Sequence, residues 1–282
     1  MDPSIFHNEA YFPARDGTRL YAQSLIPREP RAEVGFIHGY GDHSNRYREL
    51  FDRLAAAGFA THALDYRGHG RAQGRRGYVW RFEEYIGDVE VFVERIRAQA
   101  ADRRLFLIGH SHGGLVLART LQSGMRPPAG LVFASPYVGL AMEPSRLKIW
   151  SALALGRVLP WMPVPSGITP AHLTRDRAWQ EASEADPHLR PLATPRWFTQ
   201  SNQAQELALL QAPSIAAPSL VLLPEEDPIA APAAGRAFFD ALGGIDKNLI
   251  EYPGARHELF HEVEETRELV FTDLEQWLLA RS

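Results

Sequence analysis

The chain has 282 residues, of which 45% are hydrophobic and 23% are charged, a composition typical of a soluble globular protein with a sizeable core. Its formal net charge of −4 gives no electrostatic argument for binding to nucleic acid. It has no cysteine, which excludes disulfides, thiol catalysis and cysteine-ligated metal. No signal peptide is readable, and no stretch approaches the ~20 apolar residues of a membrane span, so we expect a soluble, cytoplasmic protein.

Short apolar runs alternate along the chain with segments of helical spacing. The runs predict strands at residues 9–12, 20–25, 34–37, 59–64, 105–108, 131–134, 219–223 and 247–252. The helical segments lie near residues 47–57, 82–100, 231–242 and 262–280, and another begins at residue 114. Most of these strands are continuous apolar runs, which favours an α/β fold: a mostly parallel central sheet with helices on both faces.

Residues 137–197 interrupt this alternation. They contain many prolines, no predicted buried strand and an apolar stretch at residues 149–164. This composition predicts an inserted cap over the strand ends, where ligands bind in open α/β sheets, with residues 1–136 and 198–282 forming the core. Its apolar residues would line an acyl pocket, contact lipid or pack against the core; they are Trp150, Leu153, Leu155, Leu159, Trp161 and Met162.

The stretch Gly109-His110-Ser111-His112-Gly113 lies between a predicted strand and a predicted helix. In that context the pattern G-x-S-x-G is typical of a nucleophile elbow. A turn this tight strains the serine backbone, and small flanking residues let the strand and helix pack closely. The alternative is an ordinary Gly/Ser turn, but the flanking segments favour Ser111 as a nucleophile.

A nucleophilic serine needs a base, and the base needs an orienting carboxylate. In this type of fold the acid follows the serine in the chain and the histidine comes last. Asp227 lies in the loop after the predicted strand at 219–223, with Glu225 and Glu226 as rivals. His257 follows the last predicted strand, so we predict a triad of Ser111, Asp227 and His257.

Residues 257–261, His-Glu-Leu-Phe-His, match a zinc-protease pattern. That chemistry needs both histidines well inside one helix and a third ligand. Pro253-Gly254 lies just upstream and favours a loop at His257. We therefore expect neither a metal nor a cofactor.

An oxyanion hole needs two backbone N–H donors that are already in position. The residue after the nucleophile, His112, should supply one of them. The glycine-rich loop His38-Gly39-Tyr40-Gly41 follows another predicted strand, and Tyr40 is the expected second donor. The alternative is a glycine-rich turn with no catalytic task.

Four motifs occur in order along the chain. They are His38-Gly39-Tyr40-Gly41-Asp42-His43-Ser44-Asn45-Arg46-Tyr47, Asp65-Tyr66-Arg67-Gly68-His69-Gly70, Gly109-His110-Ser111-His112-Gly113-Gly114 and Gly254-Ala255-Arg256-His257. With them the sequence resembles the monoacylglycerol lipase and lysophospholipase-like branch of the α/β-hydrolase family, over nearly its whole length. The resemblance implies an α/β-hydrolase fold with a lipophilic lid, and a serine esterase of monoacylated lipids. It also implies the same triad and the same oxyanion donors.

Matching motif positions imply that Asp42, Arg46 and His110 line a polar pocket for glycerol or another leaving alcohol. A salt bridge that pins the loop is the alternative for Asp42 and Arg46. The chain also departs from the family, because His112 stands where methionine is common. Ala72 likewise stands where a serine is common, and Ser183 where some relatives carry an aromatic residue.

These observations predict an enzyme that hydrolyses monoacylglycerols to free fatty acid and glycerol. A lysophospholipase and a general carboxylesterase are alternatives. Two further alternatives are an amide hydrolase with Glu181 or Glu184 as an amine anchor, and a hydrolase-fold protein that only binds its ligand. The expected partner is a small lipid ester and not nucleic acid, with transient peripheral contact of the cap with membranes or micelles.

Overall fold

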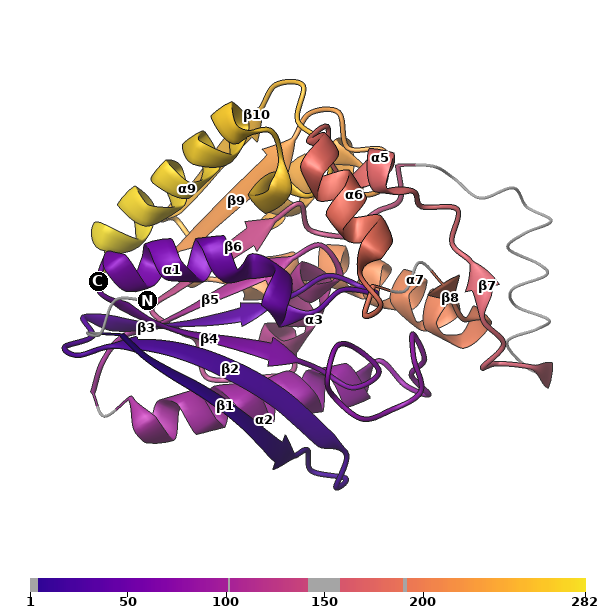
Figure 1. Cartoon of the computed structure of the whole chain (residues 1–282), viewed down its shortest axis with the longest axis horizontal. Helices are drawn as coiled ribbons and strands as arrows, with labels where there is room; N and C mark the ends of the chain where they lie inside the picture. The colour runs from indigo at the N-terminus through magenta and orange to yellow at the C-terminus, as the bar shows by residue number, and fades with distance from the viewer. Residues whose placement is uncertain (1–4, 101, 142–157, 190–191) are drawn as a thin grey trace.

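The computed structural model describes residues 5–100, 102–141, 158–189 and 192–282 (Figure 1). Three apolar residues predicted for the cap, Trp150, Leu153 and Leu155, lie outside the described residues. Within the described ranges, no helix is long and apolar enough to cross a membrane.

An eight-stranded sheet forms the centre of the molecule, in the order β1-β2-β4-β3-β5-β6-β9-β10. Its strands are β1 (Ile5–Pro13), β2 (Arg19–Pro27), β3 (Ala32–Ile37), β4 (Phe59–Asp65), β5 (Leu105–His110), β6 (Gly130–Ala134), β9 (Ser219–Pro224) and β10 (Lys247–Tyr252). β1 pairs antiparallel with β2, and β2 with β4. All the other pairs in this sheet are parallel. The predicted strands and the mostly parallel sheet are therefore confirmed.

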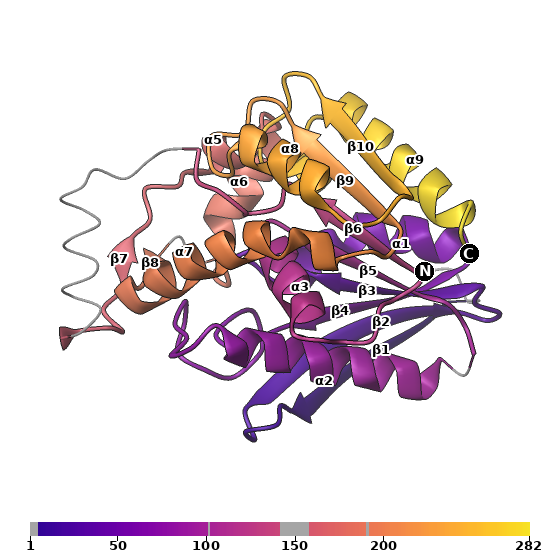
Figure 2. The same cartoon turned by 180° about the vertical axis from the view of Figure 1, so that it is seen from behind.

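Helices cover both faces of this sheet. They are α1 (Arg48–Ala56), α2 (Glu83–Gln99), α3 (His112–Gln122), α8 (Pro232–Ala241) and α9 (Glu264–Leu279). α1 and α9 pack on the face that is nearer in Figure 1. α2, α3 and α8 pack on the opposite face, which Figure 2 shows from behind. The sequence prediction of a sheet covered on both sides is correct.

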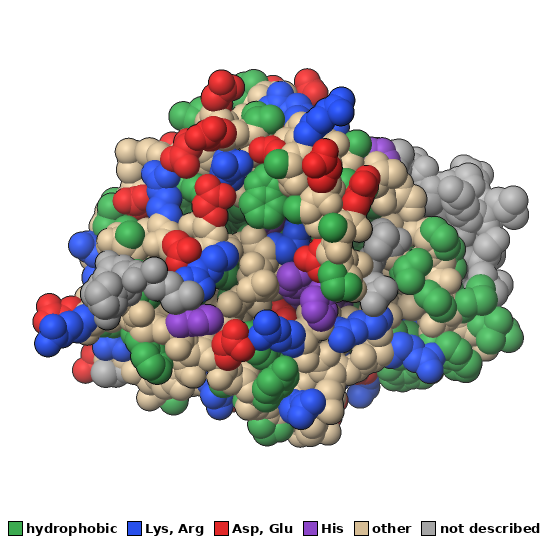
Figure 3. All heavy atoms as spheres, viewed as in Figure 1, with side chains coloured by type: hydrophobic (Ala, Val, Ile, Leu, Met, Phe, Trp, Pro, Cys, Tyr) green, Lys and Arg blue, Asp and Glu red, His purple; other side chains and the backbone are tan. Residues whose placement is uncertain are grey.

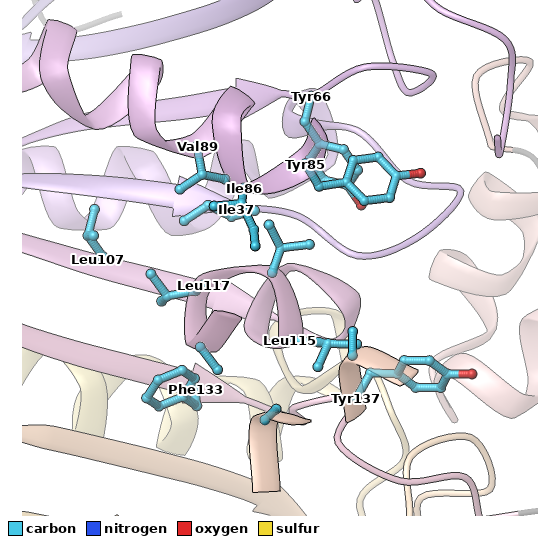
Figure 4. Packing of buried hydrophobic residues seen from close by; sticks show 14 of the residues in the cluster. Ile37, Tyr66, Tyr85, Ile86, Val89, Leu107, Leu115, Leu117, Phe133 and Tyr137 are labelled. Atoms are coloured by element: carbon cyan, nitrogen blue, oxygen red, sulfur yellow. The ribbon is translucent and has the colours of Figure 1, made fainter. Parts of the chain in front are cut away.

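The two faces hold separate hydrophobic cores because successive strand residues point to opposite sides. Phe36 lies in the core under α1 and α9, whereas its neighbour Ile37 lies in the core under α2 and α3. Figure 4 shows this second core, where Leu117 of α3 lies near Phe133 of the sheet and Leu115 lies near Tyr137. Burial on both faces explains why the central strands read as continuous apolar runs.

After β6 the chain leaves the sheet and returns through α7 (Pro195–Leu210). The described part of this excursion contains β7 (Val164–Pro165), α5 (Pro170–Leu173), α6 (Arg177–Ala185) and β8 (Leu192–Ala193). Figure 1 shows these elements beyond the ends to which the parallel strands point. No sequence pattern predicted α7, and the predicted cap boundary at residue 197 falls inside this helix. The division into core and cap remains a prediction.

Candidate active site

Ser111 occupies the sharp turn between β5 and α3. Its backbone has φ 53° and ψ −121°, a strained conformation for a residue other than glycine. Strain of this kind persists only where the surrounding packing imposes it. The turn therefore has the strand, serine and helix arrangement that the sequence predicts for a nucleophile elbow.

The glycines around Ser111 allow the close packing that holds this turn. A Cβ on Gly113 would lie 2.2 Å from the carbonyl oxygen of Ile37 in β3. A Cβ on Gly109 would lie 2.7 Å from the carbonyl oxygen of Gly113. Since neither gap admits a side chain, the elbow requires the small residues that the sequence analysis expects at both positions.

His257 connects Ser111 with Asp227. Its Nε2 lies 2.7 Å from Ser111 Oγ, and its Nδ1 lies 2.7 Å from Asp227 Oδ2. The other oxygen of Asp227 accepts hydrogen bonds from the backbone N–H groups of Ile229 and Ala230, at 2.8 and 2.9 Å. A carboxylate accepts, so the Nδ1–H of His257 donates to Asp227 and leaves Nε2 free to accept from the serine hydroxyl. This arrangement can move a proton from Ser111 to His257.

The two rival carboxylates do not take part in this chain of contacts. Glu225 and Glu226 are both exposed, and their backbone N–H groups bond to the carbonyls of Tyr252 and Ala255. Asp227 is the carboxylate of this loop that the structure brings to His257, as the sequence favours.

The ionisation of His257 depends on Asp227. Burial would lower the pKa of His257, but the charge of Asp227 and its hydrogen bond outweigh burial and raise this pKa above the ordinary 6.5. The imidazolium that forms when His257 takes a proton is thereby stabilised. Such a group is suited to general acid–base catalysis near neutral pH.

The second histidine of the zinc-like pattern has other partners. Residues Leu259–His261 form a short 3-10 helix, and His257 precedes it. His261 Nδ1 lies 2.9 Å from Glu258 Oε2, and its Nε2 lies 3.1 Å from the carbonyl oxygen of Arg46. Both ring nitrogens of each histidine are thus engaged with protein groups, and the two rings do not converge on one point.

Tyr40 and His112 line the same cavity as Ser111. Gly39 comes so close that a Cβ there would lie 3.3 Å from Ser111 Cβ. In the described part of the chain, the backbone N–H groups of Tyr40 and His112 donate to no other residue. The His112 amide also belongs to the first turn of α3, whose positive end favours negative charge. Both amides are available for an oxyanion.

The described residues enclose a cavity of about 420 Å³ that Ser111 and His257 line. This volume is typical of a small-molecule site. Much of its wall is apolar, with contributions from Leu140, Ile168, Leu173, Leu189, Phe198 and Ile229. The charged side chains among its described lining residues are all carboxylates, namely Asp42, Glu184, Asp186 and Glu258. The cavity therefore has a large apolar part and an acidic part.

Two of the three residues expected at the alcohol pocket, Asp42 and His110, line this cavity. Arg46 is not among its lining residues; its guanidinium pairs with Asp42 at 3.2 Å and with Glu258 at 2.8 Å. Burial would raise the pKa of Asp42, but Arg46 lowers it to about 2. Burial also lowers the pKa of His110 to about 4, so its ring is neutral near pH 7. For Arg46, the structure shows the salt bridge with Asp42 that is the alternative to a place in the alcohol pocket.

Glu258 and Trp197 are two of the lining residues that were not predicted. Glu258 follows His257 and lines the cavity, and its position in the chain next to the expected base was the available signal. Trp197 lies in the first turn of α7 and also lines the cavity. Its indole Nε1–H donates to His112 Nε2 at 3.2 Å. No local pattern in the sequence indicates this contact.

Comparison with known proteins agrees with this fold. The family model described as "Serine aminopeptidase, S33" matches residues 28–264. The chain is 29% identical to monoacylglycerol lipase of Mycolicibacterium smegmatis over 282 residues, covering 98% of this chain and 99% of the relative. It is 30% identical to monoglyceride lipase of Mus musculus over 271 residues, covering 94% and 88%. The crystal structure of Paleococcus ferrophilus monoacylglycerol lipase matches with a TM-score of 0.81 and 28% identity over 99% of both chains. The chain therefore belongs to the S33 serine aminopeptidase family and has the α/β-hydrolase fold.

Proposed function

We propose that this enzyme is a serine hydrolase that cleaves monoacylglycerols into a free fatty acid and glycerol. One observation carries the proposal. His257 lies within hydrogen-bond distance of both Ser111 Oγ and Asp227 Oδ2, at 2.7 Å each, and the three residues lie beside a largely apolar cavity. The relatives named monoacylglycerol lipase support the choice of substrate.

The reaction follows from the positions of these groups. His257 takes the proton of the Ser111 hydroxyl as the oxygen attacks the ester carbonyl, and Asp227 stabilises the imidazolium. The backbone N–H groups of Tyr40 and His112 hold the oxyanion, at a gain of about 3 kcal/mol for each donor. His257 then gives its proton to the leaving glycerol oxygen. Water, activated by the same histidine, releases the fatty acid from Ser111.

The acidic part of the cavity supports a neutral polyol as the leaving alcohol. Carboxylate oxygens accept hydrogen bonds from hydroxyl groups, and among the described residues Asp42 Oδ2 and Glu258 Oε1 each accept only one hydrogen bond, from Tyr47 and from Arg46. In the described lining, Lys and Arg are absent, and the nearby Arg46 is already paired with Asp42 and Glu258, so no lining cation can bind a phosphate head group. We therefore favour monoacylglycerol over an anionic lysophospholipid.

We also propose that the cap touches lipid surfaces transiently while it takes up substrate. Exposed hydrophobic side chains gather around β7 and β8; they are Val158, Leu159, Trp161, Val164 and Leu192. Figure 3 shows hydrophobic side chains clustered on that side of the molecule. Arg75 lies 5.5 Å from the ring centre of Trp161, which places positive charge beside the patch. Aromatic rings next to cations are typical of membrane-interface contacts.

The lipid contact predicts co-sedimentation of the protein with vesicles that contain anionic lipid. Trp161→Ser should weaken co-sedimentation several-fold, since it removes an exposed aromatic anchor. Leu210→Ser is the matched control, because Leu210 is also exposed but lies at the far end of α7. Equal binding of the wild-type protein and both variants would contradict the lipid contact.

A direct test of the activity compares esters of equal acyl length. We expect the wild-type protein to hydrolyse monoacylglycerol faster than lysophosphatidate, and a fluorophosphonate to label it covalently. Ser111→Ala should abolish both reactions, whereas Ser123→Ala, at the other end of α3, should leave both intact. Labelling that persists in Ser111→Ala, or a wild-type protein that cleaves no ester, would refute the assignment.

An aminopeptidase is the second candidate, because the acidic cavity lining would also suit a protonated amine. Glu184 lies on α6 and lines the cavity, as an amine anchor in the cap requires. Release of nitroaniline from aminoacyl nitroanilides would support this activity. Hydrolysis of monoacylglycerol without nitroaniline release would exclude it.

A further inference from the structure

The carbonyl group of Gly39 is held by two buried side chains. The hydroxyl of Tyr66 donates to its oxygen at 3.0 Å, and Nδ1 of His38 lies 2.7 Å from the same oxygen. A carbonyl oxygen only accepts, so the Nδ1–H of His38 donates here. The peptide between Gly39 and Tyr40 is trans and planar, so the N–H of Tyr40 points away from this carbonyl. Whatever fixes the carbonyl therefore fixes the direction of the Tyr40 N–H.

The direction of each hydrogen bond at His112 follows from Trp197. An indole N–H can only donate, so Nε2 of His112 accepts from Trp197 at 3.2 Å. Burial lowers the pKa of His112 to about 3, and its neutral ring carries the proton on Nδ1. That Nδ1–H donates to the hydroxyl oxygen of Tyr66, 3.2 Å away. The hydroxyl proton of Tyr66 is then committed to the Gly39 carbonyl.

Packing supports the same arrangement. The ring of Trp197 stacks on the ring of Tyr40, with centroids 3.6 Å apart and an angle of 24°. The ring of Tyr66 stacks on His38, with centroids 4.5 Å apart and an angle of 18°. Tyr66, His112 and Trp197 are 0%, 1% and 6% exposed, so water does not compete strongly for their hydrogen bonds. Trp197 thus contacts both residues whose amides we assign to the oxyanion.

We propose that Trp197, His112 and Tyr66 form an oxyanion relay, a set of positioning residues that aims the Tyr40 N–H at the reacting ester. The inference rests on the proposed serine hydrolase function. Its bonds run in one direction, from the indole of Trp197 through the imidazole of His112 and the phenol of Tyr66 to the Gly39 carbonyl. Because Trp197 belongs to α7, the relay couples the position of that helix to the oxyanion site.

The side chain of residue 112 matters in this scheme as much as its backbone. Methionine at this position, which the resembling family often carries, would keep the amide donor of α3. Its thioether sulfur is only a weak acceptor for the Trp197 N–H, and it has no N–H or O–H to donate to Tyr66. The histidine therefore gives this chain a connection that a methionine at residue 112 cannot supply.

The test uses two variants that remove one hydrogen-bonding group and keep the ring. Tyr66→Phe removes the hydroxyl, and Trp197→Phe removes the indole N–H. Their matched controls are Tyr252→Phe and Trp277→Phe, which remove partly buried hydrogen bonds to Asp273 and Asn248 instead. Three quantities are measured: kcat on a monoacylglycerol, inhibition by an alkyl trifluoromethyl ketone, and inhibition by an alkyl glycerol ether. The ketone forms a tetrahedral oxyanion with the serine, whereas the ether reports ground-state binding alone.

We expect Tyr66→Phe to lower kcat about 10-fold, less than the ~10²–10³-fold effect of removing an entire donor. The inhibition constant of the ketone should rise by the same factor, and that of the ether should stay unchanged. Trp197→Phe should also lower kcat and raise the inhibition constant of the ketone, by smaller factors. The double variant should be no worse than Tyr66→Phe, because both changes break one connection. The two controls should match the wild-type enzyme.

The relay would be overturned if a variant bound the ketone and the ether more weakly by the same factor. It would also be overturned if kcat stayed unchanged in both Tyr66→Phe and Trp197→Phe. Additive losses in the double variant would overturn it too. If Tyr66→Phe does not fold, the comparison of Trp197→Phe with Trp277→Phe decides alone. A wild-type protein that neither cleaves esters nor binds the ketone would refute the proposed function, whereas an active wild type with unaffected variants would refute the relay.

Discussion

Arg46 and Glu258 form a buried, bidentate ion pair, with both N–O distances at 2.8 Å. The two residues are 212 positions apart, and Glu258 directly follows His257. Arg46 also donates to Asp42 at 3.2 Å and to Ser183 of α6 at 3.0 Å. One guanidinium therefore joins the loop after Tyr40, the loop of the catalytic histidine and a helix of the predicted cap.

Removing one partner of this pair should be costly. Arg46→Met would leave the carboxylates of Glu258 and Asp42 buried without their cation, and breaking such a pair costs about 3–5 kcal/mol of unfolding free energy. Urea denaturation measures the loss. Arg48→Met is the control, because its partner Asp52 is 51% exposed and such surface pairs contribute less than about 1 kcal/mol. Equal free energies of unfolding for the two variants would contradict a stabilising role of the Arg46 ion pair.

The pH dependence of the rate should follow His257. The base must be neutral to accept the serine proton, and Asp227 raises its pKa above 6.5. Activity should therefore fall as the pH drops through that raised pKa, and the acid limb of kcat/KM reports it. In Asp227→Asn the negative charge is gone while burial remains, so the pKa of His257 should decrease and the acid limb should move to lower pH. The rate itself should fall by about 10⁴-fold, because the histidine loses its orienting partner. An acid limb that does not move would contradict this role of Asp227.

Much of the fold is readable from the sequence because its signals are local. A continuous apolar run needs burial on both faces, and each predicted run became a strand of the sheet. Ser111, Asp227 and His257 could be proposed as a triad because each lies within five residues after a predicted strand. The carboxyl ends of parallel strands meet at one edge, so residues distant in sequence are brought together.

The parts that escaped prediction depend on contacts between distant segments. Arg46 has a motif position typical of a substrate pocket, but its partner Glu258 lies beyond reach of any local pattern. The contact of Trp197 with His112 spans 85 positions and similarly has no periodic signature. α7 was not predicted because its buried face is defined by tertiary packing and not by a local apolar pattern. Small residues such as Ala204 and Ala208 form that face against the core.

Replacing a helical glycine by alanine should change the stability in opposite directions at two positions, Gly113 and Gly87. Gly113→Ala places a Cβ 2.2 Å from the Ile37 carbonyl, and relief of the clash must move β3 away from the elbow. We expect a loss of about 3 kcal/mol in stability together with lower esterase activity. Gly87 lies in α2 with nothing within 4 Å of its Cβ position, so Gly87→Ala should gain about 0.5–1 kcal/mol at full activity. Thermal unfolding of both variants checks the pair, and a stable, active Gly113→Ala protein would contradict the tight packing of the elbow.

The charge of the cavity mouth should set the choice of head group. Glu184 lines the cavity and is exposed, whereas Glu181 lies on the same helix, is also exposed and is not a lining residue. Glu184→Arg replaces a repelling charge with an attracting one, so hydrolysis of an anionic lysophospholipid should increase several-fold while monoacylglycerol turnover changes little. This gain in lysophospholipid hydrolysis should be smaller in high salt, because salt screens the attraction between an exposed arginine and the head group. Glu181→Arg changes the net charge of the protein equally, and an equal gain in this variant would show that overall charge, not the cavity lining, governs selectivity.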